Sequence, residues 1–300
     1  MNPGHTPAIE FRNVSINFDD LQALKDISFT LPRGEMLCVT GDSGSGKSVL
    51  LRLALGLLRP DEGQILINGR ETTAMEEDDL LALRREVMGM VFQENSFFSG
   101  QTVYENAAYR LDDRGWPEDE IERAVVEVLT FVGLQEDQEK QAEDLSGGMK
   151  RRLELARAMI GWPSIMLYDE PTAGLDPINA RQVLDLIIRA RDLHHTSSML
   201  VTKALHEIPY LARHHARESA HDGSVVEVAG HVSGVQVCLL EEGGIAFFGS
   251  PQEFAQSSLP AVQHMLHPMT EATRGKFDVD DPWRQNQRTR RFTDMTTTTT

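Results

Sequence analysis

Residues 41–48 read GDSGSGKS and follow an apolar run, residues 36–40, that is too short for a helix. Such a run suits a buried parallel strand, and the apolar segment from Lys47 to Leu58 suits a helix. A loop of the form G-x-x-x-x-G-K-[ST] between a strand and a helix surrounds phosphate groups with backbone N–H groups and a helix N-terminus. The alternative, a Gly/Ser turn that happens to end in Lys-Ser, does not explain both flanks.

The residue types in this loop match the needs of a nucleoside triphosphate. Small side chains let the backbone approach the phosphates, Lys47 brings positive charge to the β- and γ-phosphates, and the hydroxyl of Ser48 is a ligand for Mg²⁺. The residues expected to contact the nucleotide are Gly41, Asp42, Ser43, Gly44, Ser45, Gly46, Lys47, Ser48 and Val49.

A second apolar run, residues 165–168, ends in the two carboxylates Asp169 and Glu170. At a strand end beside the phosphate loop, Asp169 is placed to bind Mg²⁺, directly or through water. Glu170 points elsewhere because successive residues of a strand alternate sides, and there it is placed to polarise a water molecule as a general base. The alternative is a solvated acidic strand end, which is an even choice without the phosphate loop and a weaker one beside it.

The remaining chain alternates between β-rich and helical patterns. Residues 1–75 are β-rich, residues 100–160 are mostly helical, and a helix follows residue 251. Alternating runs predict strands at 8–18, 23–31 and 64–69, a further buried strand at 198–202, and a late hairpin at 235–240 and 244–248. Strands that alternate with helices indicate an α/β fold with a largely parallel sheet. We expect one unit over residues 1–250, with a helical subdomain at about 94–160, and a C-terminal helix and disordered tail over 251–300.

Composition excludes several classes. The 29 basic and 46 acidic residues give a net charge of −17, which argues against a nucleic-acid binder because phosphate neutralisation needs clustered Lys and Arg. The two cysteines, Cys38 and Cys238, lie in apolar runs and fit buried free thiols in a reducing compartment. The N-terminus lacks a signal-peptide pattern, and the longest apolar run, 49–58, is too short to span a bilayer. These features predict a cytoplasmic protein.

Residues 143–152 read EDLSGGMKRR and precede a helical run. The hydroxyl of Ser146 and the amides of Gly147 and Gly148 suit a second place of phosphate capture at a helix N-terminus. A plain helix cap by Ser146 explains the same residues and does not compete with phosphate binding. Residues 145–149, LSGGM, resemble the LSGGQ signature of ATP-binding cassette (ABC) ATPases. The resemblance implies that this stretch faces the γ-phosphate on the loop of another copy, so that a homodimer encloses two ATP molecules.

Other parts of that family pattern follow in order over roughly residues 8–250. Gln93 resembles the Q-loop glutamine, which touches Mg²⁺ or the attacking water, and Asp176 resembles the D-loop aspartate. Phe18 stands where the family stacks an aromatic ring on adenine, although as a bare residue it fits the core of the β lobe better. The resemblance implies a P-loop NTPase (RecA-like) core with an N-terminal antiparallel β lobe and an inserted α-helical subdomain. It also implies ATP hydrolysis coupled to transport, permease subunits as partners, and Mg²⁺ bound by Ser48, Gln93 and Asp169.

Met149 and the following KRR depart from LSGGQ and resemble the LSGGM-x-RR form of Mla/Mce-type phospholipid-transport ATPases. That resemblance implies phospholipid movement between bacterial membranes, and a position on the cytoplasmic face of the inner membrane. It also implies partners with MCE and STAS domains. Two alternatives remain: the ATPase of a small-solute importer, for example of amino acids, and a nucleotide-binding regulatory subunit with low turnover.

The pattern breaks at two places. Where the family has a histidine that contacts the γ-phosphate, this chain has Lys203, and His206 follows three residues later as a possible substitute or as a surface residue. The stretch at about 217–234 is longer than is usual in the family. The histidines around it, His214, His215, His221 and His231, match no zinc spacing, so a solvated loop is favoured over a metal site.

Overall fold

The computed structural model describes residues 6–19, 21–94, 96–217, 225–227 and 234–267. Its larger sheet has six strands in the order β12-β11-β3-β8-β7-β6. Five of them run parallel: β3 (Met36–Gly41), β6 (Met88–Val91), β7 (Ile165–Asp169), β8 (Ser197–Val201) and β11 (Val235–Glu241). Every residue of β3, β7 and β8 is buried, as expected for short apolar strands covered on both faces. The hairpin of β11 with β12 (Gly244–Gly249) is present and closes one edge.

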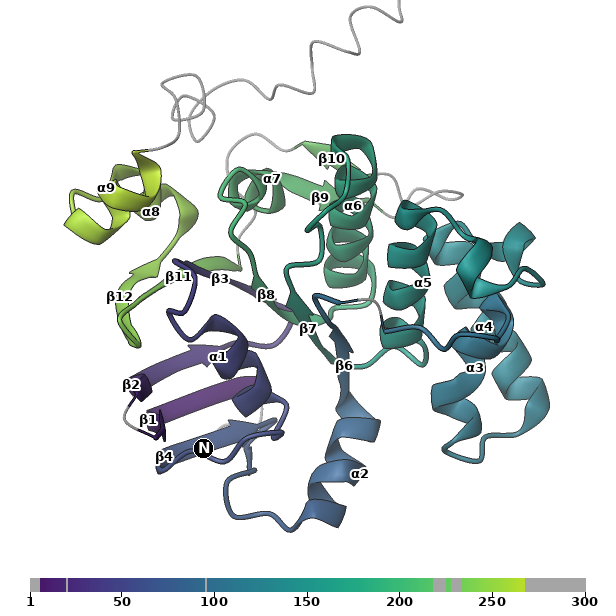
Figure 1. Cartoon of the computed structure of the whole chain (residues 1–300), viewed down its shortest axis with the longest axis horizontal. Coiled ribbons are helices and arrows are strands. Elements are labelled where there is room, and N and C mark those ends of the chain that lie inside the picture. The colour runs from purple at the N-terminus through teal and green to yellow at the C-terminus, as the bar shows by residue number, and fades with distance from the viewer. Residues whose placement is uncertain (1–5, 20, 95, 218–224, 228–233, 268–300) are drawn as a thin grey trace, which may run out of the picture.

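A second, antiparallel sheet of four strands in the order β2-β1-β4-β5 forms the N-terminal lobe. Its strands are β1 (Ile9–Phe18), β2 (Leu21–Leu31), β4 (Glu62–Ile67) and β5 (Arg70–Glu71). Helix α1 (Lys47–Ala54) contacts both this lobe and the parallel strands (Figure 1). One continuous hydrophobic core joins them through residues such as Leu24, Leu50 and Val39. The phosphate loop is therefore anchored between two sheets.

The helical subdomain consists of α3 (Val103–Asp112), α4 (Glu118–Val132), two short 3₁₀ turns (Gln135–Asp137 and Ala142–Asp144) and α5 (Gly147–Met159). In Figure 1 these helices gather on the side of the molecule away from the β lobe. Their buried residues, including Ala107, Val125 and Leu153, belong to the core under the parallel sheet. The expected fold class, with its β lobe, α/β core and helical insertion, is confirmed.

Two helices were not expected from the sequence. Helix α2 (Glu77–Val87) leads into β6, and α6 (Pro177–Leu193) follows the acidic end of β7. Helix α6 begins with an Asp176 cap and Pro177 at its first position, which are ordinary helix-start signals. The sequence therefore did contain a signal for α6.

The last described part contains α7 (Glu207–Arg213), the pair β9 (His214–Ala216) and β10 (Val225–Glu227), α8 (Pro251–Gln256) and α9 (Pro260–Leu266). Phe254 of α8 and Val262 of α9 are fully buried in the main core. The single helix expected after residue 251 is thus two short helices that pack on the nucleotide-binding unit. The tail predicted to be disordered lies outside the described residues.

Of the histidine-bearing stretch, the described residues 214–216 and 225–227 form the paired strands β9 and β10, whereas a solvated loop was expected. His214 is buried in β9, where its Nδ1 lies 2.8 Å from the carbonyl oxygen of Tyr210, and His215 Nδ1 lies 2.9 Å from Asp192 Oδ2. His221 and His231 lie outside the described residues. Within the described ranges, no group of three or more His, Cys, Asp or Glu side chains is arranged to hold a metal ion.

Both cysteines are buried free thiols, Cys38 on β3 and Cys238 on the adjacent β11. Burial raises the pKa of both thiols to about 12. In the part of the chain that the structure describes, we find no helix with the length and apolar character needed to cross a bilayer.

Candidate nucleotide-binding and catalytic site

The phosphate loop depends on its glycines. A Cβ atom at Gly41 would lie 2.3 Å from the carbonyl oxygen of Leu240, and one at Gly46 would lie 2.7 Å from that of Ala23. Gly44 has open space around it but needs its φ of +85°, in the left-handed region that favours glycine. The loop is therefore fitted closely against β11 and β2 and open on its other side, where Asp42 and Ser43 are exposed.

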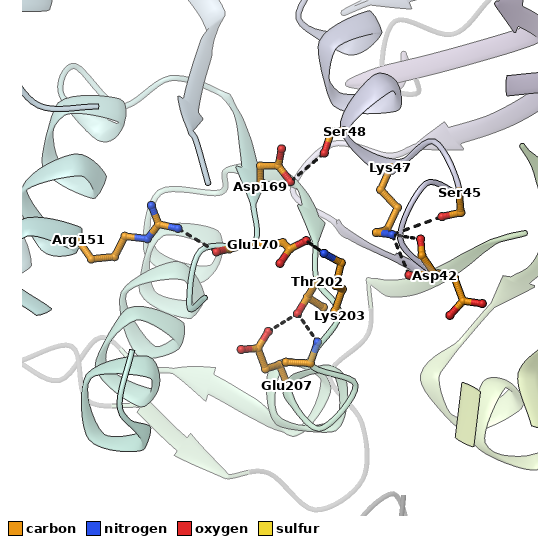
Figure 2. Close-up of polar contacts among 12 residues, drawn as sticks. Asp42, Ser45, Lys47, Ser48, Arg151, Asp169, Glu170, Thr202, Lys203 and Glu207 are labelled. Carbon is orange, nitrogen blue, oxygen red and sulfur yellow. Dashed lines mark hydrogen bonds and ion pairs between the residues drawn. The ribbon is translucent and has the colours of Figure 1, made fainter. Parts of the chain in front are cut away.

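Lys47 is buried, and its ammonium lies inside the loop. Its Nζ donates to the carbonyl oxygens of Gly41 (2.8 Å) and Asp42 (2.6 Å) and lies 3.4 Å from Ser45 Oγ (Figure 2). All three are neutral oxygens, so no bonded carboxylate among the described residues compensates the charge. Burial, with the nearby Lys203 ammonium as a second cause, lowers the pKa of Lys47. Negatively charged phosphates of a bound nucleotide would compensate the charge of Lys47.

Ser48 and Asp169 meet at the base of this loop. Ser48 Oγ lies 3.5 Å from Asp169 Oδ1, at the carboxyl end of β7 (Figure 2). Burial raises the pKa of Asp169, because the charged form is desolvated there. A hydroxyl and a carboxylate oxygen form a hard oxygen donor set, and Mg²⁺ binds through few protein ligands plus phosphates and water. These two residues therefore fit Mg²⁺.

Gln93, the third expected Mg²⁺ ligand, is exposed just beyond the end of β6. Within the described part of the chain it forms no hydrogen bond to Ser48 or Asp169. Phe18 is 42% exposed at the end of β1, where it pairs with Leu21. The interpretation of Phe18 as a core residue of the β lobe is therefore wrong, because the lobe core closes before the strand ends. Its ring is available to a ligand.

Glu170 follows β7 with an unusual backbone. Its φ is +46°, and its N–H donates to the carbonyl oxygen of Val201 at 2.9 Å. Its largely buried carboxylate accepts from Lys203 Nζ at 2.8 Å (Figure 2). Lys203, expected to face a phosphate, thus contacts the predicted general base. His206 is exposed before α7, and its side chain forms no capping hydrogen bond.

The segment around Lys203 is held by Glu207, a residue that sequence reasoning missed. Glu207 is buried and accepts hydrogen bonds from the hydroxyls of Thr202 (2.7 Å) and Thr172. Burial raises the pKa of Glu207, and the two hydroxyl donors oppose this. A carboxylate at a helix start is common for dipole reasons alone, so the sequence carried no distinctive signal for this role.

The stretch predicted to capture a second phosphate lies at the start of α5. Ser146 caps the helix by accepting from the Met149 N–H at 3.3 Å. A Cβ atom at Gly148 would lie 2.0 Å from Asn179 Oδ1, whereas one at Gly147 would meet nothing within 4 Å. No hydrogen bond between described residues joins 145–149 to 41–49. The chain alone therefore does not bring the two stretches together.

Asp176, the expected D-loop residue, caps α6. Its Oδ1 accepts from the N–H groups of Ile178 (3.0 Å) and Asn179 (3.1 Å), and its Oδ2 accepts from the Asn179 side chain. The hydrogen bonds from Asn179 lower the pKa of Asp176. Since Asn179 also lies against Gly148, the starts of α5 and α6 form one exposed surface.

Comparison with known proteins places these features in a family. The family model described as ABC transporter matches residues 24–173, half of the chain. Methionine import ATP-binding protein MetN 1 of Rhodopseudomonas palustris is 44% identical over 192 residues, covering 62% of this chain and 51% of that protein. The relative named MetN from Leifsonia xyli is 43% identical over 184 residues, covering 60% and 54%. The chain spans about half the length of the curated relatives it matches.

Two solved structures share the fold. The dimeric structure of MJ0796, a bacterial ABC transporter cassette, has a TM-score of 0.68 at 24% identity and covers 81% of this chain and 98% of its own. CbiO1 from Clostridium perfringens, part of the transporter complex CbiONQ, has a TM-score of 0.72 at 24% identity, covering 91% and 100%.

These relatives overturn the phospholipid expectation and its MCE- and STAS-domain partners, because they are named for methionine import. The residues behind that expectation serve packing within the chain. Met149 packs on the core, Arg151 is buried, and Arg152 donates to the carbonyl oxygens of Val132 and Gly133. Side chains directed inward do not report on cargo. The broader prediction, a likeness to ABC proteins, is confirmed, because the chain belongs to the ABC transporter family.

Proposed function

We propose that this chain is the ATP-hydrolysing subunit of an importer of a small solute of amino-acid size. The proposal of ATP hydrolysis rests on the placement of Glu170 directly after Asp169. Asp169 meets Ser48 at the base of the loop that holds Lys47. The names of the relatives support methionine, or a similar amino acid, as the solute.

Binding of ATP would use groups that are already in place. Lys47 can exchange the carbonyl oxygens of Gly41 and Asp42 for phosphate oxygens, and the loop amides 43–49 surround the β-phosphate. The exposed ring of Phe18 offers a face for adenine. Mg²⁺ held by Ser48 and Asp169, with Gln93 brought in, would neutralise charge on the β- and γ-phosphates.

Hydrolysis would depend on Glu170 as the acceptor of a proton from the attacking water. In the structure Lys203 holds the Glu170 carboxylate at 2.8 Å, and its positive charge is felt at Lys47. Lys203 is thus placed between the base and the phosphate space. It can hold the Glu170 carboxylate in place and then share its charge with the γ-phosphate.

Completion of the site would require a second copy of the chain. The open space at Gly147 and the exposed helix caps Ser146 and Asp176 leave the start of α5 accessible from outside the chain. In a homodimer these groups would face the γ-phosphate on the partner's loop. ATP would then act by stabilising the closed pair, and hydrolysis would release it. Transmembrane permease subunits, bound to the dimer at the cytoplasmic face of the inner membrane, would convert this cycle into import.

A second candidate function, a nucleotide-binding regulatory subunit with low turnover, is favoured by one observation. The ion pair between Lys203 and Glu170 occupies the carboxylate that the first proposal needs as a base.

Phosphate release by the purified chain with Mg²⁺ and ATP, compared with Glu170→Gln, separates the two candidates. We expect the wild type to hydrolyse ATP and the variant to bind ATP without turnover. Equal inactivity of both chains, with the permease present, would reject the enzyme and favour the regulator.

The cargo is tested separately by uptake of labelled methionine, other amino acids and phospholipid in cells that lack the chain. Restoration of methionine uptake by the wild type, but not by Lys47→Ala, supports the proposal. Unchanged uptake of every amino acid tested would contradict it.

A further inference from the structure

Arg151 is a buried arginine on α5 that makes four hydrogen bonds across the molecule. Its Nη2 donates to the carbonyl oxygen of Glu170 at 2.8 Å (Figure 2). Its Nε donates to the carbonyl oxygen of Pro171 at 2.5 Å. Its Nη1 donates to the carbonyl oxygen of Phe92 (2.7 Å) and to Glu154 Oε2 (2.7 Å). One guanidinium therefore reaches the segments that follow two different strands, β6 and β7.

Glu154, one turn further along α5, completes this arrangement. Its side chain has no solvent exposure, and its Oε1 accepts from the N–H of Ser96 at 2.9 Å. The Arg151–Glu154 pair thus holds the backbone on both sides of Gln93, at Phe92 and Ser96. A buried pair that satisfies its hydrogen bonds in this way fixes geometry more surely than it adds stability.

The contact with Glu170 is the most consequential. A non-glycine residue at a φ of +46° keeps that conformation only where its surroundings hold it. The carbonyl of Glu170 is held by Arg151, and its N–H is held by Val201. The direction of the Glu170 carboxylate therefore depends on a residue of the helix that begins at Ser146. Lysine could not replace this fork of donors, because an ammonium lacks its planar, spread geometry.

We propose that Arg151 is a positioning residue for ATP hydrolysis, and that it links the two nucleotide sites of a homodimer. This inference rests on the proposed function. In that dimer, α5 begins at the partner's γ-phosphate, while Glu170 and Gln93 serve the chain's own nucleotide. Arg151 joins these groups within one rigid unit. ATP binding at the partner's site thereby changes the position of Glu170 at the chain's own site, and the rate of hydrolysis depends cooperatively on ATP.

The test is Arg151→Lys, with Arg152→Lys as the matched control. Arg152 is the next residue of α5, but it donates to Val132 and Gly133 in the helical subdomain. We expect Arg151→Lys to lower kcat at least about tenfold and to bring the Hill coefficient for ATP towards one. Affinity for a fluorescent ATP analogue should stay within about twofold, because the phosphate loop is untouched, and thermal unfolding should show that the variant is folded at the assay temperature.

A paired variant keeps the inference testable if Arg151→Lys does not fold. Arg151→Met with Glu154→Met removes both buried charges together, so neither is left unpaired. A folded double variant with low kcat supports the positioning role, and one with the wild-type kcat and Hill coefficient overturns it. Wild-type cooperativity in Arg151→Lys, or an equal loss in Arg152→Lys, also overturns it. An inactive wild type would instead refute the proposed function, and this inference would fall with it.

Discussion

The two adjacent glycines of the LSGGM stretch have different surroundings, and this difference makes a sharp prediction. A methyl group at Gly148 would collide with the Asn179 side chain at 2.0 Å, whereas one at Gly147 would meet no described atom within 4 Å. A side chain at 148 must therefore displace Asn179, whereas one at 147 displaces no described atom. If residue 147 must be glycine, the reason lies outside the single chain.

The expected energies follow from these positions. Gly147 is the first residue of α5 and its φ is not in the left-handed region, so Gly147→Ala should leave stability unchanged or raise it by up to about 0.5–1 kcal/mol. Gly148→Ala must displace Asn179 and disturb the Asp176 cap, which should cost about 1–3 kcal/mol. In the closed dimer, the Gly147 methyl group would obstruct the γ-phosphate of the partner's ATP and lower kcat at least about tenfold, or ~1.4 kcal/mol.

The assay combines thermal unfolding, phosphate release and ATP-dependent dimerisation on a sizing column. Gly147→Ala should melt at or above the wild-type temperature and fail to hydrolyse or dimerise. The main effect of Gly148→Ala should be a melting temperature below that of the wild type. Wild-type phosphate release and dimerisation by Gly147→Ala would refute the assignment of this stretch as half of a nucleotide site.

Three further perturbations test neighbouring parts of the site. Lys203→Ala should lower kcat about tenfold, because the charge on the γ-phosphate is no longer neutralised, and Lys203→His should stay closer to the wild type. Faster hydrolysis by Lys203→Ala would show instead that the ion pair restrains Glu170. Burial raises the pKa of Glu207, and His206 and Glu170 are the charged groups near it. Glu207 therefore stabilises the fold fully below the unfolded carboxyl pKa of about 4.3. This stabilisation is lost as the pH rises through the pKa of Glu207 in the folded protein. Urea unfolding at a series of pH values should show this loss of unfolding free energy in the wild type and not in Glu207→Gln. Parallel plots of unfolding free energy against pH for the two chains would contradict the prediction. Phe18→Ala should raise the KM for ATP about tenfold at an unchanged melting temperature, and Phe18→Trp should restore the KM, as expected for stacking on a base. An unchanged KM in Phe18→Ala would show that the ring of Phe18 does not bind adenine.

Features that depend on a continuous run of residues could be predicted from the sequence. The strand, loop and helix around 41–48 are specified by adjacent residues, and parallel strands place their carboxyl ends at one edge, which brings Asp169 to Ser48. The β lobe and helical insertion followed from hydrophobic periodicity. Helix α2 was missed although Glu77, Asp78 and Asp79 stand in its first turn, an acidic start that favours a helix N-terminus.

Contacts between segments far apart in the sequence could not be predicted. Lys203 lies in a different loop from Glu170, and only the neighbouring positions of β7 and β8 bring their side chains together. Arg151 stood in the sequence as part of a family resemblance, while its bonds to Phe92, Glu170 and Pro171 depend on the folded sheet. The cargo was misjudged for a related reason: the residues used to infer it contact the interior of this chain.

In the function proposed above, two copies of this chain complete each ATP site. Sedimentation of Glu170→Gln with Mg²⁺ and ATP, with the bound nucleotide counted, tests it most directly. We expect Glu170→Gln to form a dimer that retains one ATP per chain, and we expect Gly147→Ala, added to the same variant, to return it to monomers. If Glu170→Gln binds ATP but stays monomeric, at ATP concentrations well above those at which the wild type hydrolyses ATP, a second copy does not complete the site.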